Sequence, residues 1–268
     1  MVVATRNRPR LLSGLLDALP AALDDRCEVV VVDSASSTGA TADLCAHRGV
    51  RLERLERPGT SRARNAGIAC TTSDLVAFTD DDCLPQPGWT AALRAAFADP
   101  AVGLVTGRVL PDAPTSAPLS VTTEERSRAM SAGDLVGHGA NAALRRSALE
   151  QVGGFDEALG PGTPLRAAED ADLFRRVLAA GWQGRHAADA VVLHRQWRTR
   201  RAALTTSWAY GIGAGAAARR AGTSWRGPVL TDALHPAVRD LRAGYLTGTA
   251  AGLLRAAGAV VGTVRGGR

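Results

Sequence analysis

The first hundred residues of the chain alternate between short apolar runs and amphipathic stretches. Continuous apolar runs at Glu28–Val32 and Asp74–Thr79, each followed by aspartate, predict buried strands of a parallel sheet. Shorter runs at Val2–Thr5 and Val50–Leu55 predict two more strands. Between them lie stretches of helical spacing, which predict helices at Pro9–Leu23, Ala40–His47, Ser61–Ala69 and Gly88–Phe97. This alternation indicates an α/β fold with a mostly parallel sheet flanked by helices.

The second half of the chain has a less regular pattern. Pro111–Pro118 is rich in proline and predicts a loop, and the polar segment Thr122–Ala132 is expected to be helical. Apolar residues at helical spacing predict an amphipathic helix over Ala167–Ala180. A short strand is predicted at Ala190–Leu193, and it runs directly into His194.

The chain after Thr199 follows helical spacing and is rich in alanine and glycine. We therefore expect one α/β domain over residues 1–198 and a helical C-terminal extension over residues 199–268. No uncharged apolar run reaches the length of about 18 residues that a membrane-spanning helix needs, so none is expected. The run Leu253–Val264 is interrupted by Arg255, which is compatible with a membrane surface but not with a bilayer crossing.

The net charge of the chain is concentrated in one segment. Arginine supplies all 32 basic residues, against 26 acidic residues, and the formal net charge of the 268-residue chain is +6. Between Ala190 and Thr231 there are seven arginines and no acidic residue, so this segment carries +7 and the remainder of the chain −1. Such a segment needs an anionic partner or a solvated surface.

The composition limits the class of protein. Hydrophobic residues make up 46% of the chain, which is too many for a disordered protein. Four cysteines without CxxC spacing argue against a disulfide scaffold and favour reduced thiols. Apolar residues follow Met1 directly, with no basic n-region, so we expect no signal peptide. The expected location is cytoplasmic, peripheral at the inner face of the membrane if the basic segment contacts lipid.

Three adjacent carboxylates, Asp80–Asp81–Asp82, follow the predicted strand Asp74–Thr79. Ligands of parallel sheets bind beyond the carboxyl ends of the strands, and Asp33 follows another predicted strand in the same way. Adjacent carboxylates repel each other, and a divalent cation removes this cost. Their hard oxygen atoms suit Mg²⁺ or Mn²⁺. The alternative is a solvated acidic turn that binds nothing.

An acidic pair and a lone histidine are ambiguous on their own. Glu169–Asp170 lies near the start of the predicted amphipathic helix, where the helix dipole favours carboxylates whatever their function. The functional interpretation is a general base that accepts a hydroxyl proton. His194 would complete a Mn²⁺-type site with two carboxylates, although a lone histidine usually has a structural role.

Seven short segments occur in a recognisable order and spacing between Val2 and Arg198. They are Val3–Arg8 (VATRNR), Val31–Ser37 (VVDSASS), Pro58–Gly67 (PGTSRARNAG), Phe78–Pro85 (FTDDDCLP), Gly139–Arg146 (GANAALRR), Gly153–Glu157 (GGFDE) and Glu169–Leu173 (EDADL). Each segment is weak evidence alone, but together they resemble family 2 glycosyltransferases, which have the GT-A fold. Asp80 and Asp82, followed by Pro85, are similar to the DxD metal motif of that family.

The resemblance implies a catalytic domain that moves a sugar from a nucleotide diphosphate sugar to an acceptor hydroxyl, with inversion at the anomeric carbon. The positions that match donor contacts of the family are Thr5, Arg6, Asp33, Arg62, Asn65, Asp80, Asp81 and Asn141. The positions that match ligands of Mn²⁺ or Mg²⁺ are Asp80, Asp82 and His194. Asp170 matches the catalytic base of the ED motif, with Glu169 before it. The acceptor class is open and includes lipid-linked acceptors at an anionic membrane, and no nucleic acid is expected.

The chain also departs from the family pattern, and two other functions remain to be compared. No QxxRW motif of processive members is evident, which favours single transfer. A haloacid-dehalogenase-like phosphohydrolase also places paired aspartates after a strand, but here Cys83–Leu84 follow Asp82 and the chain has no lysine. A non-catalytic module could instead bind nucleotide sugar or nucleic acid through the arginine-rich segment, where Trp197 and Trp208 allow stacking.

Overall fold

The computed structural model describes residues 1–114, 121–131, 133–220, 234, 237–238, 240–242 and 246–265. These residues divide into two compact units. The first, the sheet unit, consists of Met1–Asp112, Val121–Phe155 and Asp170–Arg195. The second, the helical unit, contains the described parts of Asp156–Glu169 and Gln196–Arg268. The domain boundary expected after residue 198 stays a prediction.

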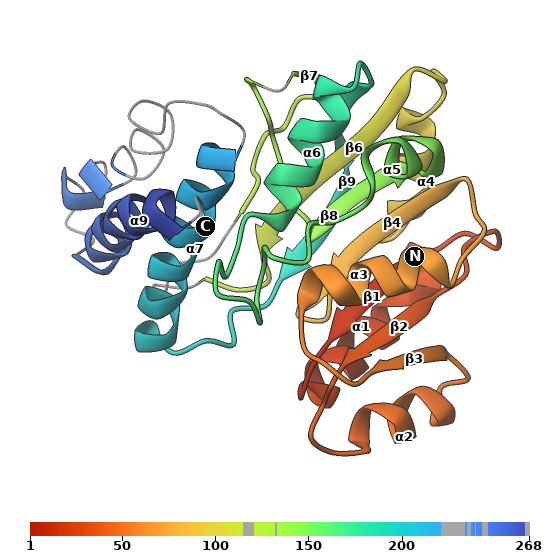
Figure 1. Ribbon diagram of the computed structural model, residues 1–268. Coiled ribbons are helices and arrows are strands. Elements are labelled where there is room, and N and C mark those ends of the chain that lie inside the picture. Colours follow the sequence, from red (N-terminus) through yellow and green to blue (C-terminus); the bar gives the residue numbers. More distant parts are fainter. Residues whose placement is uncertain are drawn as a thin grey trace. The chain divides into compact units, whose positions relative to one another are not determined.

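The sheet unit is built on a nine-stranded sheet (Figure 1). Its strands are β1 (Val2–Thr5), β2 (Val30–Ser34), β3 (Arg51–Leu55), β4 (Leu75–Asp80), β5 (Cys83–Pro85), β6 (Val102–Pro111), β7 (Arg128–Met130), β8 (Asn141–Arg145) and β9 (Gln183–His194). Their order is β3-β2-β1-β4-β8-β6-β9-β5, and β7 pairs with β9.

Strands β3, β2, β1 and β4 are parallel, as the alternating apolar pattern predicts. The helices that connect them are α1 (Pro9–Ala22), α2 (Ala40–His47) and α3 (Thr60–Ala69). Thr5 is in register with Asp33, and Ala4 with Asp80, so the ends of β1, β2 and β4 share one edge. This is the edge at which parallel sheets bind ligands. The predicted α/β fold class is confirmed.

Beyond β4 the sheet is mixed. Strand β8 is antiparallel to both β4 and β6, β6 is parallel to β9, and β5 and β7 are antiparallel to β9. Asn141 at the start of β8 lies opposite Thr79 near the end of β4. The residues before β8 therefore reach the same edge as the three carboxylates, although they come from the second half of the chain.

Several local expectations for this second half are wrong. The segment expected to be helical, Thr122–Ala132, is extended in its described residues and contains β7. The predicted strand Ala190–Leu193 is only the end of the twelve-residue β9, and β6 and β8 have no counterpart among the predicted strands. The alanine and glycine residues in β8 and β9 have little intrinsic strand preference, so pairing with distant strands determines their conformation. Of the predicted loop Pro111–Pro118, Pro111 ends β6 and residues 115–118 lie outside the described residues.

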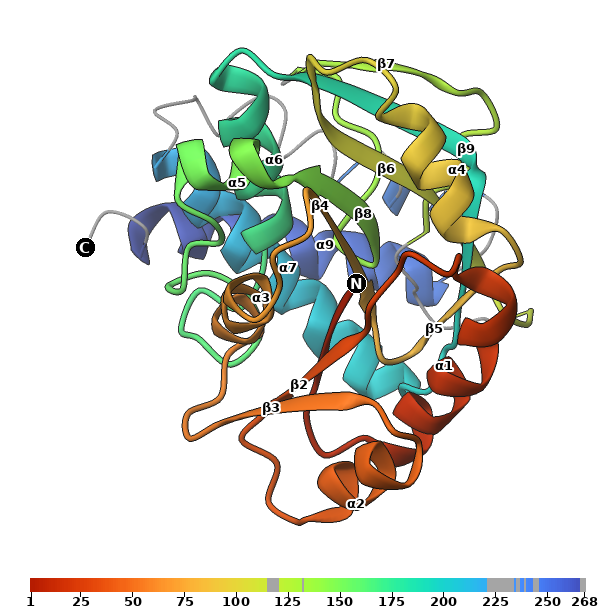
Figure 2. The same cartoon turned by 90° about the vertical axis from the view of Figure 1, so that its right-hand side faces the viewer.

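Apolar layers attach helices to both faces of the sheet (Figure 2). On one face, α1 and α4 (Trp89–Ala96) pack over a cluster that includes Leu12 and Trp89. On the other face, α3, α5 (Arg146–Val152) and α6 (Glu169–Ala179) cover a cluster that includes Phe78 and Phe174. Burial of these side chains is the main stabilising contribution, and it fixes the start of α6 relative to the end of β4.

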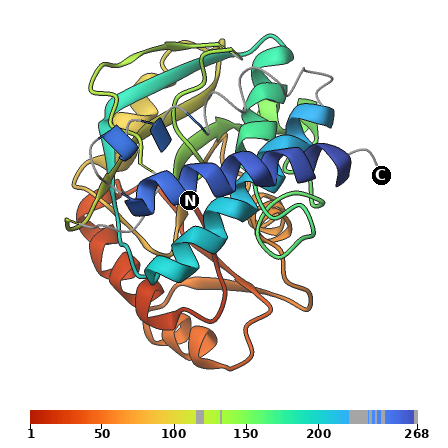
Figure 3. The same cartoon turned by 90° about the vertical axis from the view of Figure 1, so that its left-hand side faces the viewer.

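The helical unit contains α7 (Arg200–Arg220) and α9 (Leu246–Arg265), which pack side by side (Figure 3). Glycine makes this approach possible, since a methyl group at Gly258 would overlap the carbonyl oxygen of Trp208. Among the residues that the structure describes, none of the helices combines the length and the hydropathy of a bilayer span. The expected helical C-terminal region is confirmed for these residues.

Candidate active site

The first of the carboxylates after β4 to consider is Asp81, which is fully buried. Its Oδ2 accepts a 2.6 Å hydrogen bond from the Thr5 hydroxyl, and its Oδ1 lies 3.0 Å from Nη2 of Arg8. Burial raises the pKa of Asp81 to about 7 against the opposing effect of Arg8, and the neighbouring Asp82 adds to the rise. Asp81 therefore connects the turn after β4 to β1, and the donor contact expected of Asp81 and Thr5 stays a prediction.

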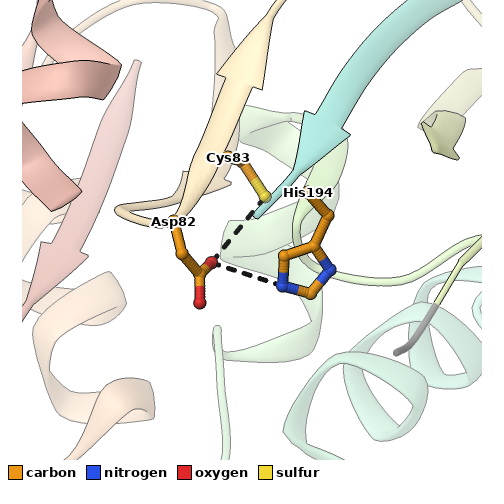
Figure 4. A group of neighbouring side chains, drawn as sticks. All are labelled: Asp82, Cys83 and His194. Carbon is orange, nitrogen blue, oxygen red and sulfur yellow. Dashed lines mark hydrogen bonds and ion pairs between the residues drawn. The ribbon is translucent and has the colours of Figure 1, made fainter. Parts of the chain in front are cut away.

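Asp82 and His194 meet where β5 pairs with β9 (Figure 4). Nε2 of His194 lies 3.5 Å from Oδ1 of Asp82, and only 6% and 2% of the two side chains are exposed. The strand register explains the meeting, because Cys83, which follows Asp82, is in register with His194. Two residues more than one hundred positions apart in the sequence thus form one buried pair.

This pair can hold a divalent cation. The sulfur of Cys83 lies 3.9 Å from Oδ1 of Asp82 and belongs to the same group of donor atoms. Burial raises the pKa of the Cys83 thiol well above its ordinary value, and the side chain packs into the apolar layer against α1. Since a thiol binds metal as the thiolate, Cys83 is the poorest of the three ligands. The carboxylate and the imidazole fit Mn²⁺, and the carboxylate also fits Mg²⁺.

Asp80 has a different partner. Its Oδ1 lies 2.9 Å from Nη2 of Arg64, a buried residue of α3 whose guanidinium carbon is 5.3 Å from the centroid of the Phe155 ring. Within the described residues, the carboxylate of Asp80 is not part of the group formed by Asp82 and His194. Of the three expected metal ligands, the structure thus brings two together and pairs the third with arginine.

Asp170, the second residue of α6, is held by two backbone N–H groups. The N–H of Gly139 donates to Oδ2 and the N–H of Ala171 donates to Oδ1, each over 2.7 Å. These bonds fix the orientation of the carboxylate and leave about half of its lone-pair sites for a substrate. A methyl group at Gly139 would lie 2.9 Å from the Arg64 guanidinium, so Gly139 contacts Arg64 as well as Asp170. The preceding Glu169 is buried and begins α6.

His138 is a site residue that the sequence pattern does not identify. Burial lowers its pKa, against the opposing charges of Asp170 and Asp80. Its Nε2 is buried and has no hydrogen-bond partner among the residues that the structure describes. In the sequence, His138 stands between Gly137 and Gly139. The pattern of hydrophobic and polar positions does not indicate a function for a histidine in such a segment.

Asp33 and Arg6 lie at the ends of β2 and β1. Asp33 is fully buried, with its Oδ2 3.1 Å from Nη1 of Arg54 and its Oδ1 accepting a 2.9 Å bond from the Ser36 N–H. Arg6 is exposed, and its Nε donates to the Ala35 carbonyl over 3.3 Å. Asp33 therefore holds the loop after β2, and the sequence pattern gives no sign of its partner Arg54.

Asn141 bonds to three other elements of the sheet unit, and its contact with a donor stays a prediction. It is fully buried, and its Oδ1 accepts a 2.8 Å bond from Nε1 of Trp89. Its Nδ2 donates to the carbonyl oxygens of Arg108 and Ala190, also over 2.8 Å each. Both amide hydrogens and the carbonyl oxygen of Asn141 are thus used inside the fold, where they join β8 to α4, β6 and β9.

Asn65 and Arg62, on α3, also bond within the sheet unit. Both ends of the Asn65 amide bond to the backbone of Phe155, over 2.9 Å each. Nη1 of Arg62 donates to the Pro58 carbonyl over 3.1 Å. Asn65 therefore holds the GGFDE segment against α3, and the contact of either residue with a donor stays a prediction.

Comparison with known proteins identifies the family. The sequence model described as glycosyl transferase family 2 matches residues 1–153, which is more than half of the chain. The chain belongs to this family. The pre-mycofactocin glycosyltransferase of Mycobacterium tuberculosis is 32% identical over 221 residues, covering 75% of this chain and 45% of that relative. Glycosyltransferase AglE of Haloferax volcanii is 28% identical over 178 residues, covering 62% of this chain and 56% of AglE. The chain thus spans about half the length of these curated relatives.

Solved structures show the same fold. The mannosyltransferase PcManGT from Pyrobaculum calidifontis, solved with GDP-Man and Mn²⁺, matches 98% of this chain and 86% of its own with a TM-score of 0.66 at 20% identity. TarS of S. aureus matches 79% of this chain and 38% of its own with a TM-score of 0.57 at 17% identity. The expected GT-A fold and the resemblance to family 2 are therefore confirmed, and glycosyl transfer is the activity of the class.

Proposed function

We propose that this protein is a metal-assisted, inverting glycosyltransferase that moves a sugar from a nucleotide diphosphate sugar to an acceptor hydroxyl. One observation carries the proposal. A chain of neighbouring residues connects the acidic turn to the carboxylate of Asp170 on α6. Asp80 forms an ion pair with Arg64, Arg64 lies next to Gly139, and the Gly139 N–H donates to Asp170. A direct transfer of the sugar from donor to acceptor needs a metal site at the diphosphate and a general base at the acceptor hydroxyl. The sheet edge offers candidates for both.

Asp82 and His194 would hold Mn²⁺ or Mg²⁺ at the diphosphate end. The cation supplies positive charge that offsets the negative charge building on the departing nucleoside diphosphate. The 3.5 Å separation of the Asp82 carboxylate and the His194 imidazole, together with their burial, supports this assignment. Asp80 would face the donor beside Arg64. The Mn²⁺ and GDP-Man bound to PcManGT support the class of cofactor and of donor.

Asp170 would act as the general base. Its carboxylate would accept the proton of the acceptor hydroxyl while the hydroxyl oxygen bonds to the anomeric carbon, and the bond from that carbon to the diphosphate oxygen breaks. Attack on the face opposite the leaving group inverts the anomeric carbon without a covalent intermediate. The bonds from Gly139 and Ala171 support this role, because they hold the carboxylate in one orientation. Glu169, the first residue of α6, would help only to position Asp170 and would not transfer a proton.

The nucleotide would lie along the ends of β1 and β2. Arg6 is an exposed cation there, and Asp33 with its partner Arg54 shapes the loop beside it. Arg62 on α3 is a further candidate for the nucleotide side.

We also propose that the helical unit contacts an anionic membrane surface. One face of α9 exposes Leu246, Leu253, Val260 and Val264, of which 74%, 55%, 44% and 67% of the surface is accessible. Their spacing of seven, seven and four residues keeps them on one side of the helix. Residues 196–268 contain eleven arginines and two aspartates, for a charge of +9. An aliphatic helix face within a strongly basic segment is typical of helices at an anionic lipid surface.

Sedimentation with lipid vesicles tests this contact. We expect binding to vesicles that contain phosphatidylglycerol, weaker binding to pure phosphatidylcholine, and loss of binding in the double variant Leu253→Asp, Val260→Asp. Val121→Asp is the matched control, because Val121 in the sheet unit is 44% exposed. Absence of binding at low salt would remove the proposal, as would a stable dimer that the double variant dissociates.

A panel of nucleotide sugars tests the transferase proposal. With MnCl₂, one class of UDP-, GDP- or dTDP-sugar should raise the unfolding temperature of the protein, because specific ligands stabilise the folded state by mass action. The same donor should release nucleoside diphosphate slowly, with water as acceptor. Asp82→Asn should lose the Mn²⁺ dependence of both signals. Binding without any turnover would favour the non-catalytic binding module instead.

A further inference from the structure

The His138 imidazole is half-buried at the candidate active site, and its Nε2 atom is buried. Its Nε2 has no hydrogen-bond partner among the described residues. Buried polar groups in native proteins nearly always have a partner, and exceptions cluster where a ligand, ion or water completes the bond. With no partner among the described residues, a bound ligand is a candidate for the missing hydrogen bond of His138.

The backbone around His138 is held in place by hydrogen bonds and by close packing. The His138 carbonyl accepts a 3.1 Å bond from the Asn141 N–H, and the Gly139 N–H is bonded to Asp170. Gly137 has a positive φ of 101°, and a side-chain methyl there would collide with Thr106. Such a backbone fixes the position from which the His138 side chain extends, and a binding site needs this kind of support.

The surroundings of His138 define the chemistry of its partner. The charged groups that act on the ring are Asp170 on α6, Asp80 on β4, Arg64 on α3 and, where protonated, His194 on β9. Two carboxylates disfavour a phosphate oxygen at this position, because both partners would be anionic. A neutral imidazole can donate to or accept from a hydroxyl group, which is itself neutral.

The position of His138 also indicates which hydroxyl it binds. In the proposed single displacement, the transferred sugar lies between the leaving diphosphate and the catalytic base. His138 lies within electrostatic reach of both Asp80, at the diphosphate end, and Asp170, the base. We propose that His138 is a specificity-determining residue whose Nε2 hydrogen-bonds a hydroxyl of the transferred sugar. This inference rests on the transferase function proposed above.

Affinities for matched ligands test the role of His138. The wild type, His138→Leu and His138→Gln are titrated with the nucleotide sugar that the donor panel selects, with its nucleoside diphosphate, and with MnCl₂ alone. His138→Leu should weaken nucleotide-sugar binding about tenfold, as expected for one buried hydrogen bond, and leave the other two affinities unchanged. His138→Gln should restore part of the loss, because its amide can still bond a hydroxyl.

The remaining outcomes overturn the inference. Equal losses for the nucleotide sugar and the diphosphate would assign His138 to the phosphates, and a weaker Mn²⁺ affinity would make it a metal ligand. Unchanged sugar binding in both folded variants would mean that the ring contacts no donor hydroxyl. If His138→Leu does not fold, His138→Gln is the deciding variant. Unchanged affinity of His138→Gln for the nucleotide sugar, together with an unchanged preference among sugars, would reject the proposed role of His138. Failure of the wild type to bind any nucleotide sugar would instead reject the transferase proposal itself.

Discussion

Replacement of Gly139 by alanine should lower turnover while leaving the protein folded. Gly139 has no positive φ, so alanine is compatible with its backbone, and the three atoms nearest to the added methyl group are those of the Arg64 guanidinium at 2.9–3.1 Å. An ordinary contact begins at 3.4 Å, so the guanidinium must move by about 0.5 Å. That movement stretches the 2.9 Å ion pair with Asp80 and strains the bond from Gly139 to Asp170.

The size of the effect follows from the sensitivity of catalysis to position. A misplacement of about 1 Å in an active site can cost about 100-fold in rate, so a shift of half that size should cost about tenfold, or about 1.4 kcal/mol of activation free energy. The free energy of unfolding should change by less than about 1 kcal/mol, because the end of a long side chain can move at small cost.

Release of nucleoside diphosphate with Mn²⁺ measures the effect of Gly139→Ala, and thermal unfolding checks the fold. Gly133→Ala is the matched control, since a methyl group at Gly133 has no neighbour within 4 Å. Wild-type turnover in a stable Gly139→Ala protein would refute the idea that Arg64 and Asp170 are positioned through Gly139. An equal decrease in the Gly133→Ala control would refute it as well.

Three further predictions concern stability. Burial lowers the pKa of His186, whose Nε2 lies 2.9 Å from the Glu124 carbonyl oxygen. The unfolded chain therefore binds the proton of His186 more tightly than the folded protein does. The free energy of unfolding should fall as the pH drops below about 6.5, by up to about 1.4 kcal/mol per pH unit. His186→Gln should flatten this slope in urea titrations, and an unchanged slope would contradict the assignment. Gly258→Ala should destabilise the helical unit by about 1–3 kcal/mol, because the added methyl group would overlap the backbone carbonyl oxygen of Trp208. Urea unfolding followed by circular dichroism measures this change. An unchanged stability would mean that α7 and α9 pack differently. Ala35→Gly should raise the unfolding free energy by about 0.5–1 kcal/mol, because Ala35 has a φ of 60°, and a loss of stability would show that this φ is not strained.

The parallel half of the fold could be predicted because its signals are local. The apolar runs that lead into Asp33 and Asp80 define strand ends, and parallel pairing then brings these two residues to one edge. The start of α6 at Glu169 was predictable in the same way, from an amphipathic pattern preceded by acidic residues. Local sequence patterns therefore predict the elements that carry Asp80 and Asp170.

The rest of the site depends on contacts between distant residues. Nothing near Asn141 in the sequence indicates that Trp89 and Ala190 will bond to its amide, so these bonds could not be predicted. In the same way, Asp81 is held by Thr5, the last residue of β1, and by Arg8, which follows β1. Neither partner is near Asp81 in the sequence.

His138 illustrates the opposite error. It is surrounded by charges only because β8 pairs antiparallel with β4, and the small residues of β8 do not predict that pairing. The site residues that sequence patterns miss are thus those whose environment is assembled by the mixed half of the sheet.

The most direct test of the proposed mechanism is the effect of Asp170→Asn on turnover and on donor binding, measured on the same preparation with the same nucleotide sugar and Mn²⁺. Asparagine keeps the size of the side chain and can still accept the bond from Gly139, but it cannot accept the acceptor proton. Diphosphate release should fall by about 10²–10⁴-fold, the usual contribution of a general base, while the dissociation constant of the nucleotide sugar stays the same. Turnover that equals that of the wild type would contradict the role of Asp170 as the base.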